Sequence, residues 1–461
     1  MTRKNWWIFP SIFILSLIIF SQSLTYYFFQ DDWFVLNWIR TGNLFSFFSF
    51  RTDIIYWRPL SMPIFFFIGK QLFGLNPLGF HILAFLIHFI NIILVYLLIR
   101  QLKFEKTLSY FAAFIWGTAA FHFVPLSWLS TTSYIIGPTF ILSSIIFFLK
   151  SKIKTSFLFF LLGLLTSELT LVTIPLIVLV DENIRKKFKN LLPFLIAVVP
   201  YLVVRFFIFP VPASGAYAIA PRKKIISNLL WYFAWTFNVA ERFSTIFYLS
   251  TVKSAAGYFK DFFKLLIGPL ILMLTFWLLT LSLKPNLKIL ARGFGWFIIG
   301  LSPVIFLPDH AYAMYLPIAS LGIIYIFCAA LEKAKRFRPP IMAVVALLWF
   351  ISSFLTVDLL RSNHWIGNEQ AASRAYMDFL KKEIRTPPHG SIFIFRNPVG
   401  NISATNGFTL HDSESTLYQS LNASAAVQVL YDDSTLTSFF PKANQKVEFN
   451  QNQPVFEIVP K

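Results

Sequence analysis

Two adjacent carboxylates, Asp31 and Asp32, follow the first long apolar run of the chain, and Arg58 lies further along the same connecting segment. A carboxylate can deprotonate a hydroxyl group, and a guanidinium can hold a phosphate in a bidentate contact. Charges at the end of an apolar helix are either water-facing anchors or part of a site, because they are costly to draw unpaired into hydrocarbon. The connecting segment at about 25–78 is therefore the first place to look for chemistry.

The composition is that of a polytopic membrane protein. Of 461 residues, 56% are hydrophobic and only 13% are charged, whereas soluble domains carry about 25% charged residues. The net charge of +19 comes from short clusters of Lys and Arg between apolar runs. Such clusters are typical of topology signals and of contacts with anionic lipids, so we expect membrane lipids and no nucleic acid as partners. The single cysteine, Cys328, excludes an intrachain disulfide and is expected to be a packing residue.

Apolar runs predict the helices that must position these residues. A transmembrane helix needs about 20 apolar residues. By this criterion we expect eleven spans, several of them short, at residues 6–24, 79–99, 107–125, 134–149, 155–167, 169–181, 191–209, 262–283, 293–307, 312–331 and 340–358.

Basic clusters orient the expected bundle. Every second connection carries Lys or Arg, as cytoplasmic loops do, whereas the connections at 125–133 and 308–311 carry neither. The amino terminus is therefore expected in the cytoplasm, with Asp31, Asp32 and the carboxyl terminus outside. The apolar segment Ile225–Ser250 is interrupted by Glu241 and Arg242. As one span it would invert every later loop, so we expect an interfacial helix on the outer side, although two re-entrant pieces would also preserve the parity.

The last hundred residues differ from the rest in being polar and rich in turns. We expect a helix at 371–384 and short strands at 391–395, 426–431 and 455–459. The predicted fold is an all-α integral membrane bundle over residues 1–360, followed by a small exported α/β or β-rich tail domain over residues 361–461.

An enzyme whose site faces outward cannot draw on cytoplasmic nucleotides, and the chain shows no P-loop or Gly-rich phosphate-binding turn. An activated substrate must then be carried to the outer face, most simply on a lipid phosphate. Its transfer needs a carboxylate as base and a cation to hold the leaving phosphate.

Several segments resemble a known family. They are the Asp31–Asp32 pair, YWRPLS (Tyr56–Ser61), FGLNPLGFHILAFLIHFINIILVYLLIRQL (Phe73–Leu102), TSELTLVTIPLIVLVDE (Thr166–Glu182), LPFLIAVVPYLVVRF (Leu192–Phe206) and LPDHAYAMYLPIASLG (Leu307–Gly322). Together they are similar to the GT-C polytopic glycosyltransferases, most of all to bacterial relatives of the transmembrane and tetratricopeptide-repeat protein O-mannosyltransferases. The chain lacks the tetratricopeptide repeats, which leaves the acceptor open.

The resemblance implies a dolichyl- or undecaprenyl-phosphate-linked sugar as donor and an inverting transfer to an acceptor. Asp31 would be the general base and Asp32 its partner, with mutual repulsion raising the pKa of one of them. Arg58 would bind the donor phosphate; the alternative is that Arg58 neutralises an Asp. A divalent cation held by Asp31 and Asp32 is left open, and the chain has no His and carboxylate spacing that suggests a zinc site.

The remaining candidates each have a functional and a structural interpretation. Glu168 is either an intramembrane site residue or a helix-end carboxylate in water. The family often has an Arg where this chain has Ala313 and Met314, so phosphate binding would shift to His310, with Tyr315 beside it. Further candidates are Arg222, Lys223 and Lys224, which would clamp a lipid phosphate or anchor the chain to headgroups, and Trp33, which would lie at the site or at the membrane interface.

His81, His88 and Asn91 share one side of the second expected span, where hydrogen bonds between helices are the expected role. The sequence thus predicts an outward-facing membrane glycosyltransferase with a polyprenyl-phosphate sugar donor and a cell-envelope acceptor. The alternatives are a transporter or flippase of lipid-linked intermediates, and a noncatalytic envelope scaffold.

Overall fold

The computed structural model describes residues 6–51, 53–209, 212, 214–219, 224–244, 252–396, 413–441 and 453–458, and the side chains at 252–263 and 413–416 lie outside this description. Arg222 and Lys223 also lie outside the described residues.

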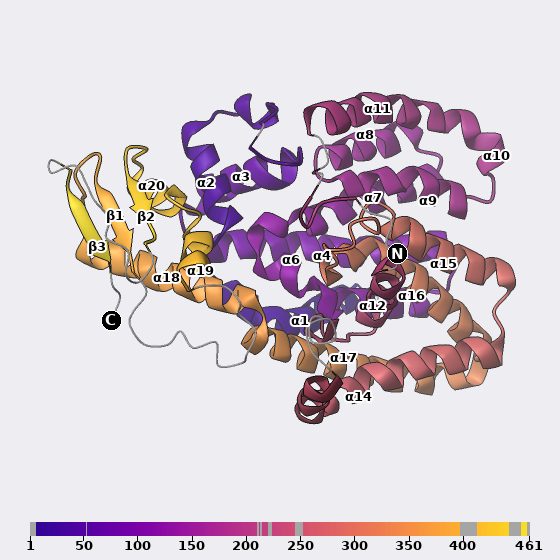
Figure 1. Cartoon of the computed structure of the whole chain (residues 1–461). Helices are drawn as coiled ribbons and strands as arrows, with labels where there is room; N and C mark the ends of the chain where they lie inside the picture. The colour runs from indigo at the N-terminus through magenta and orange to yellow at the C-terminus, as the bar shows by residue number, and fades with distance from the viewer. Residues whose placement is uncertain are drawn as a thin grey trace.

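The described chain is a helical bundle with a small sheet at one end (Figure 1). Its longer helices are α1 (Ile8–Phe20), α2 (Asp31–Thr41), α3 (Phe65–Phe73), α4 (Pro77–Gln101), α5 (Lys106–Gly117), α7 (Ser133–Leu149), α8 (Ile153–Leu164), α9 (Thr173–Val180), α11 (Leu192–Val203), α12 (Lys224–Thr236), α14 (Val252–Leu283), α15 (Leu287–Leu301), α16 (Leu316–Lys333), α17 (Arg338–Asn363), α18 (Trp365–Glu383), α19 (Ser413–Leu421) and α20 (Ala425–Tyr431). Shorter α-helices are α6 (Phe123–Ser127) and α10 (Ile184–Lys187).

Short 3-10 and π turns extend or join these helices. They are η2 (Ser21–Thr25), η3 (Ser46–Phe48), η4 (Leu60–Ile64), η5 (Ala120–His122), η6 (Leu129–Thr131), η7 (Glu168–Val172), η8 (Phe188–Leu191), η9 (Val204–Ile208), η10 (Ala313–Tyr315) and η11 (Lys335–Phe337).

Seven described helices are long and apolar enough to cross a membrane, or eight if the bent pair Lys106–Gly117 and Ala120–Ser127 counts as one span. Three of the expected spans, at 155–167, 169–181 and 293–307, form helices too short to meet this length. The count of eleven therefore stays a prediction, whereas the multi-pass character follows from the helices themselves.

Helix α4 makes the interhelical hydrogen bonds that were expected of His81, His88 and Asn91. His81 Nδ1 lies 3.0 Å from the carbonyl oxygen of Leu126, and His88 Nε2 lies 2.9 Å from that of Gly117. Asn91 donates to the carbonyl of Ile135 at 2.7 Å. These contacts bind α4 to α5, α6 and α7. Cys328 is buried in α16, as expected of a packing residue.

The basic connections gather at one end of the bundle. Lys103 and Arg292 both contact Glu182, at 2.6 and 3.4 Å, although they come from different connections. At the same end Arg338 pairs with Glu105 at 2.8 Å. The alternation of basic and non-basic loops in the sequence therefore corresponds to two ends in space. The orientation of these ends in a membrane stays a prediction.

The expected interfacial segment Ile225–Ser250 begins with α12, which ends at Thr236 and is not among the helices long enough to span. Asn228 and Tyr232 are buried on one face of α12. Residues 245–250 lie outside the described part of the chain. The placement of this segment at an outer interface stays a prediction.

The tail is an α/β unit. Its three parallel strands, β1 (Ile392–Phe395), β2 (Thr437–Phe439) and β3 (Val455–Ile458), lie in the order β2-β1-β3. Ile392 pairs with both Thr437 and Val455. The central strand β1 is buried along its whole length, as expected of a strand flanked on both sides. The predicted strands at 391–395 and 455–459 and the helix at 371–384 are confirmed within α18, β1 and β3.

The predicted strand at 426–431 is wrong, because these residues form α20. Short apolar runs are ambiguous between strand and helix. Here the run begins with Ala425 and Ala426, which favour helix, and it ends at Asp432 in the left-handed region. The residues of β2, Thr437–Phe439, were not predicted.

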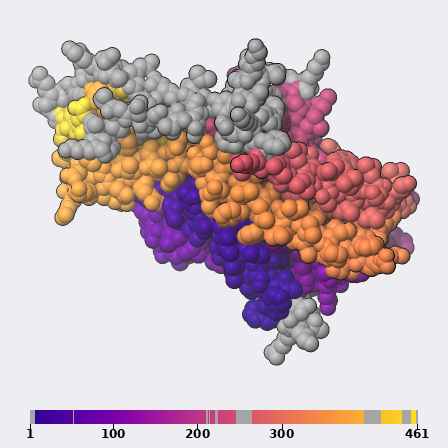
Figure 2. All heavy atoms as spheres, turned by 90° about the horizontal axis from the view of Figure 1, so that it is seen from below, coloured from indigo at the N-terminus to yellow at the C-terminus, as the bar shows by residue number. Residues whose placement is uncertain are grey.

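The tail docks on the helix that carries the carboxylate pair. Trp33 donates from its indole to Ser373 of α18 at 2.9 Å, and Asn37 donates to Gln428 of α20 at 2.9 Å. The backbone N–H of Gln30 donates to the carbonyl of Ser420 at 2.9 Å. Only His364 separates α17 from α18, and Figure 2 shows the two helices as one continuous orange band along the molecule. The tail is thus attached to the bundle through α17 and docks on α2 and the residue just before it.

Close backbone contact between α15 and α16 gives a test of the packing. A Cβ atom on Gly322 would lie 2.2 Å from the carbonyl oxygen of Gly293, whereas one on Gly295 would meet only Leu179 side-chain atoms, at 3.5 Å. We expect Gly322→Ala to destabilise the fold by about 1–3 kcal/mol, because the helices must separate. Thermal unfolding of purified protein in detergent measures this, with Gly295→Ala as the control. Equal unfolding midpoints for the two variants would refute the predicted contact.

Candidate functional site

A cavity of about 610 Å³ lies between the bundle and the tail. It contains five of the residues singled out from the sequence: Asp31, Arg58, Glu168, His310 and Tyr315. They come from segments almost 300 residues apart in the chain and from different elements of the bundle. The structure therefore brings the main sequence candidates together in one space.

Asp31 and Asp32 have different environments although they are neighbours. Both lie in the first turn of α2, where the helix dipole favours negative charge. Asp31 lines the cavity, and within the described chain its carboxylate has no hydrogen-bonding partner. Asp32 is fully buried and accepts hydrogen bonds from the backbone N–H and the hydroxyl of Ser130, at 2.8 and 2.6 Å, and from the N–H of Phe29 at 3.3 Å. Asp32 thus positions α2, and Asp31 is available for chemistry.

Burial controls the protonation of both carboxyl groups. It raises the pKa of Asp31, and it raises the pKa of Asp32 to about 7 against the opposing effect of the hydrogen bonds from Ser130 and Phe29. The charge of Asp31 makes only a smaller contribution to the raised pKa of Asp32. Repulsion within the pair, which the sequence suggested, is therefore secondary to burial.

Arg58 is paired inside the protein. Its Nε donates to Glu168 at 3.0 Å, and its second guanidinium nitrogen contacts the other carboxylate oxygen of Glu168. The guanidinium also lies over the ring of Tyr56, with Cζ 4.2 Å from the ring centre, and its side chain is only 7% exposed. The carboxylate that neutralises Arg58 is therefore Glu168, and neither Asp of the pair does so. A contact of Arg58 with phosphate stays a prediction.

His310 lies among aromatic rings in the cavity wall. Its ring centre is 4.2 Å from that of Tyr217 and 4.7 Å from that of Tyr312. Burial and the nearby charge of Arg58 lower the pKa of His310 to about 4, so the imidazole is neutral at pH 7. His310 can therefore hydrogen-bond a ligand but supplies no charge for a phosphate. Tyr315 lies beside it, edge-on to Tyr134 at 5.1 Å.

Other sequence candidates lie away from the cavity. Trp33 is buried, where its indole bonds Ser373, so neither site contact nor interfacial anchoring describes it. Lys224 forms an ion pair with Asp309 at 2.8 Å and does not line the cavity. Of the three basic residues expected to bind a lipid phosphate, Arg222, Lys223 and Lys224, only Lys224 lies within the described residues.

The pair does not offer two free carboxylates to a cation. Both oxygens of Asp32 accept hydrogen bonds from the protein. Within the part of the chain that the structure describes, no group of three His, Cys, Asp or Glu side chains could hold a metal ion. A divalent cation between Asp31 and Asp32 stays a prediction without support from this geometry.

Two charged residues of the cavity were missed from the sequence. Arg205 lies in η9 and makes no ion pair with a carboxylate among the described residues. The sequence contained a signal for Arg205, since a lone Arg in an apolar run is a functional candidate by default. Glu369 comes from α18 of the tail, and burial raises its pKa to about 7. No spacing in the sequence connects Glu369 to a site some 340 residues earlier.

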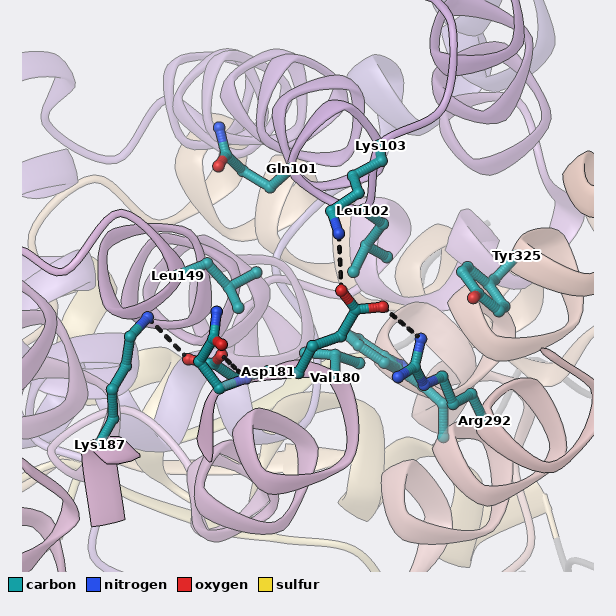
Figure 3. A pocket seen from close by; sticks show the side chains of 12 residues that line it. Gln101, Leu102, Lys103, Leu149, Val180, Asp181, Lys187, Arg292 and Tyr325 are labelled. Atoms are coloured by element: carbon teal, nitrogen blue, oxygen red, sulfur yellow. Dashed lines mark hydrogen bonds and ion pairs between the residues drawn. The ribbon is translucent and has the colours of Figure 1, made fainter. Parts of the chain in front are cut away.

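A second pocket, of about 150 Å³, lies at the end of the bundle with the basic connections (Figure 3). Its charged side chains neutralise one another: Lys103 and Arg292 contact Glu182, and Lys187 contacts Asp181 at 3.0 Å. Asp181 and Glu168 lie at opposite ends of the short helix pair η7–α9. The two pockets therefore lie at opposite ends of the bundle, and the second joins three connections through ion pairs.

The sequence matches no protein-family model and no curated protein. Among solved structures, the chain is similar to the arabinofuranosyltransferase AftD from mycobacteria, with 12% sequence identity and a TM-score of 0.45. The match covers 91% of this chain and 31% of that chain, so this chain spans less than a third of the length of AftD.

The ion pair of Arg58 and Glu168 gives a test of the site's construction. Glu168→Gln leaves a buried guanidinium without its counter-charge, and we expect a loss of about 2–4 kcal/mol in stability, reduced by the partial exposure of Glu168. The exposed pair of Arg51 and Asp53 on the same connecting segment is the matched control, because Asp53→Asn should change stability by less than about 1 kcal/mol. Thermal unfolding measures both, and equal shifts would contradict the buried pairing.

Proposed function

We propose that the chain is a membrane glycosyltransferase of the GT-C type, which transfers a sugar from a polyprenyl-phosphate carrier to a cell-envelope acceptor at the outer face of the membrane. The observation that carries this proposal is one cavity that combines Asp31, a carboxylate without a hydrogen-bonding partner in the described chain, with Arg205, a cation that forms no ion pair there and donates to the carbonyl of Phe209. A base and a phosphate ligand are the two groups that the transfer requires.

The donor is assigned to the side of the cavity formed by η9. The helix segment Ile184–Ile208 is long and apolar but only 17% buried inside the protein, so most of its surface is available to lipid. Val203 is 50% exposed and Phe206 is 57% exposed, and Phe206 also lines the cavity. A polyprenyl chain can lie along this apolar surface while its phosphate meets Arg205 at the cavity. In this assignment Arg205 makes the phosphate contact that the family resemblance implied for Arg58.

The proposed reaction is a single displacement. An acceptor hydroxyl oxygen bonds to the anomeric carbon of the donor sugar as its proton passes to the carboxylate of Asp31. The bond between the anomeric carbon and the phosphate oxygen breaks, and polyprenyl phosphate leaves with the bonding electron pair. Arg205 stabilises the charge that develops on this phosphate. Attack from the face opposite the leaving group inverts the anomeric configuration.

The loop charges support a location of the cavity on the outer face. The cavity lies at the end of the bundle opposite the basic connections, and cytoplasmic loops carry the excess of Lys and Arg. Polyprenyl-phosphate sugars are the donors that remain available outside the cytoplasm. This reasoning supports the same orientation that the sequence predicted.

Asp31→Asn tests the base. We expect donor consumption to fall by about 10²–10⁴-fold, because the amide cannot accept the hydroxyl proton. In the wild type the rate should fall with decreasing pH as Asp31 becomes protonated. Burial raises the pKa of Asp31, so the midpoint of this fall should lie above the value of about 3.9 for an exposed aspartate.

The measurement is release of polyprenyl phosphate from a panel of radiolabelled polyprenyl-phosphate sugars by purified protein in lipid, with envelope extract as acceptor. Full activity of Asp31→Asn would remove it as the base. If donors bind but none is consumed by the wild type, the proposed reaction is wrong and a transporter or scaffold takes its place.

Arg205→Gln tests the donor phosphate contact. Loss of one charge-assisted hydrogen bond is expected to raise the donor KM or the Kd for polyprenyl phosphate about tenfold or more. Arg51→Gln is the matched control, because its partner Asp53 is exposed and the pair lies outside the cavity lining. Unchanged binding in Arg205→Gln would exclude this residue as the phosphate ligand.

A further inference from the structure

The tail forms part of the cavity wall on the side of Asp31. Trp365 and Glu369 of α18 and Gln419 of α19 line the cavity, and Trp128 lies beside them. Trp365 and Glu369 are four residues apart and therefore share one face of the helix. None of these four side chains takes part in the donor contacts or in the proton transfer described above.

The two tryptophans form a corner. Their rings meet at 85° with centres 5.2 Å apart, and Phe29 stacks behind Trp128 at 5.8 Å. Phe29 is fully buried, whereas both tryptophans are only partly buried and line the cavity. The indole N–H of Trp128 has no hydrogen-bonding partner among the described residues. The corner therefore presents two aromatic surfaces to a ligand in the cavity, and Phe29 supports the ring of Trp128 from the protein side.

Glu369 is a buried carboxylate without a cation. It is 6% exposed, its one side-chain partner in the described chain is the amide of Gln30, and it forms no ion pair there. Buried carboxylates are normally neutralised by a cation or saturated with hydrogen bonds. Gln30 precedes Asp31 directly and has a left-handed φ of 49°. This contact therefore holds Glu369 next to the candidate base Asp31. The carboxylate of Glu369 can still accept further hydrogen bonds.

We infer that this corner is the acceptor subsite and that the acceptor is a glycan, an inference that rests on the proposed function. The C–H face of a sugar ring packs on the indole surfaces of Trp128 and Trp365, and ring hydroxyls donate to Glu369 and bond Gln419. One hydroxyl of the bound ring is then held beside Asp31 for transfer.

The chemistry of the corner favours a glycan over a peptide. A peptide acceptor would need partners for its backbone N–H and C=O groups. The corner and its neighbours instead offer the aromatic faces of Trp128 and Trp365, the carboxylate of Glu369 and the amide of Gln419. This set matches the alternating C–H faces and hydroxyl groups of a sugar ring.

Binding is tested in the Asp31→Asn background and without donor, so that no transfer consumes the ligands. Full-length protein in lipid nanodiscs is titrated with neutral oligosaccharides and with Ser- and Thr-containing peptides, by saturation-transfer NMR. We expect saturable binding of at least one oligosaccharide, weakened about tenfold or more by Trp365→Ala and by Glu369→Gln. The controls are Trp277→Ala on α14 and Glu383→Gln at the exposed end of α18, which should leave binding unchanged.

Milder variants guard against misfolding. Gln419 is exposed, so Gln419→Ala should fold normally and still weaken glycan binding. Glu369→Asp keeps the charge but shortens the side chain, and we expect it to bind more weakly than wild type and more tightly than Glu369→Gln. Binding of peptides with no binding of glycans, or equal glycan affinity in the Asp31→Asn background alone and with each of the four cavity substitutions added, would overturn the inference.

Kinetics separates this inference from the proposed function. With a working donor and acceptor, Glu369→Gln and Trp365→Ala should raise the acceptor KM about tenfold and leave the Kd for polyprenyl phosphate unchanged. Transfer with an unaltered acceptor KM would refute the subsite while the glycosyltransferase stands. Glycan binding at the corner with no transfer from any donor would refute the enzyme while the subsite stands.

Discussion

The buried carboxylate of Asp32 connects the candidate base to the helix bundle, and the geometry of the cavity depends on this connection. It accepts two hydrogen bonds from Ser130 and one from Phe29, and it is sealed from solvent. In such a low-dielectric environment these bonds are strong, and an unmatched donor would be costly. They fix the start of α2 against the segment before α7, and the start of α2 fixes the direction of Asp31. The chemistry proposed for Asp31 thus depends on Asp32, whose carboxylate is occupied by hydrogen bonds from the protein.

Charged residues at the two ends of the bundle differ in whether they are paired. At the end with the basic connections, Glu182 and Asp181 are matched by cations from three connections. In the large cavity Arg58 is matched by Glu168, but Asp31, Arg205 and Glu369 form no ion pair within the described chain. An apolar bundle tolerates buried charge only at a cost in stability. The charges that stay unmatched at the cavity are therefore the ones for which a ligand is the natural partner.

Sequence alone was sufficient for the helical, multi-pass character of the bundle and for two of the three strands of the tail. The apolar runs located the long helices, and carboxylates beside apolar runs directed attention to Asp31 and Glu168, which both line the cavity. Sequence could not assign different roles to Asp31 and Asp32, since that depends on which carboxylate meets Ser130. Sequence left open whether Arg58 binds phosphate or neutralises an Asp, and its actual partner Glu168, 110 residues away, could not be paired by spacing. Glu369 was missed because its place in the cavity results from docking of the tail, and the 426–431 strand failed because a six-residue apolar run fits either secondary structure.

The single residue between α17 and α18 has a consequence for how molecules reach the cavity. His364 is extended and buried, with an aromatic contact to Phe123 at 5.6 Å, so the joint is packed against the bundle. The one-residue connection gives α18 little freedom to move away from the bundle. The tail is also hydrogen-bonded to Gln30 and Trp33. In the proposed function, donor and acceptor therefore enter the cavity while the tail stays docked on α2.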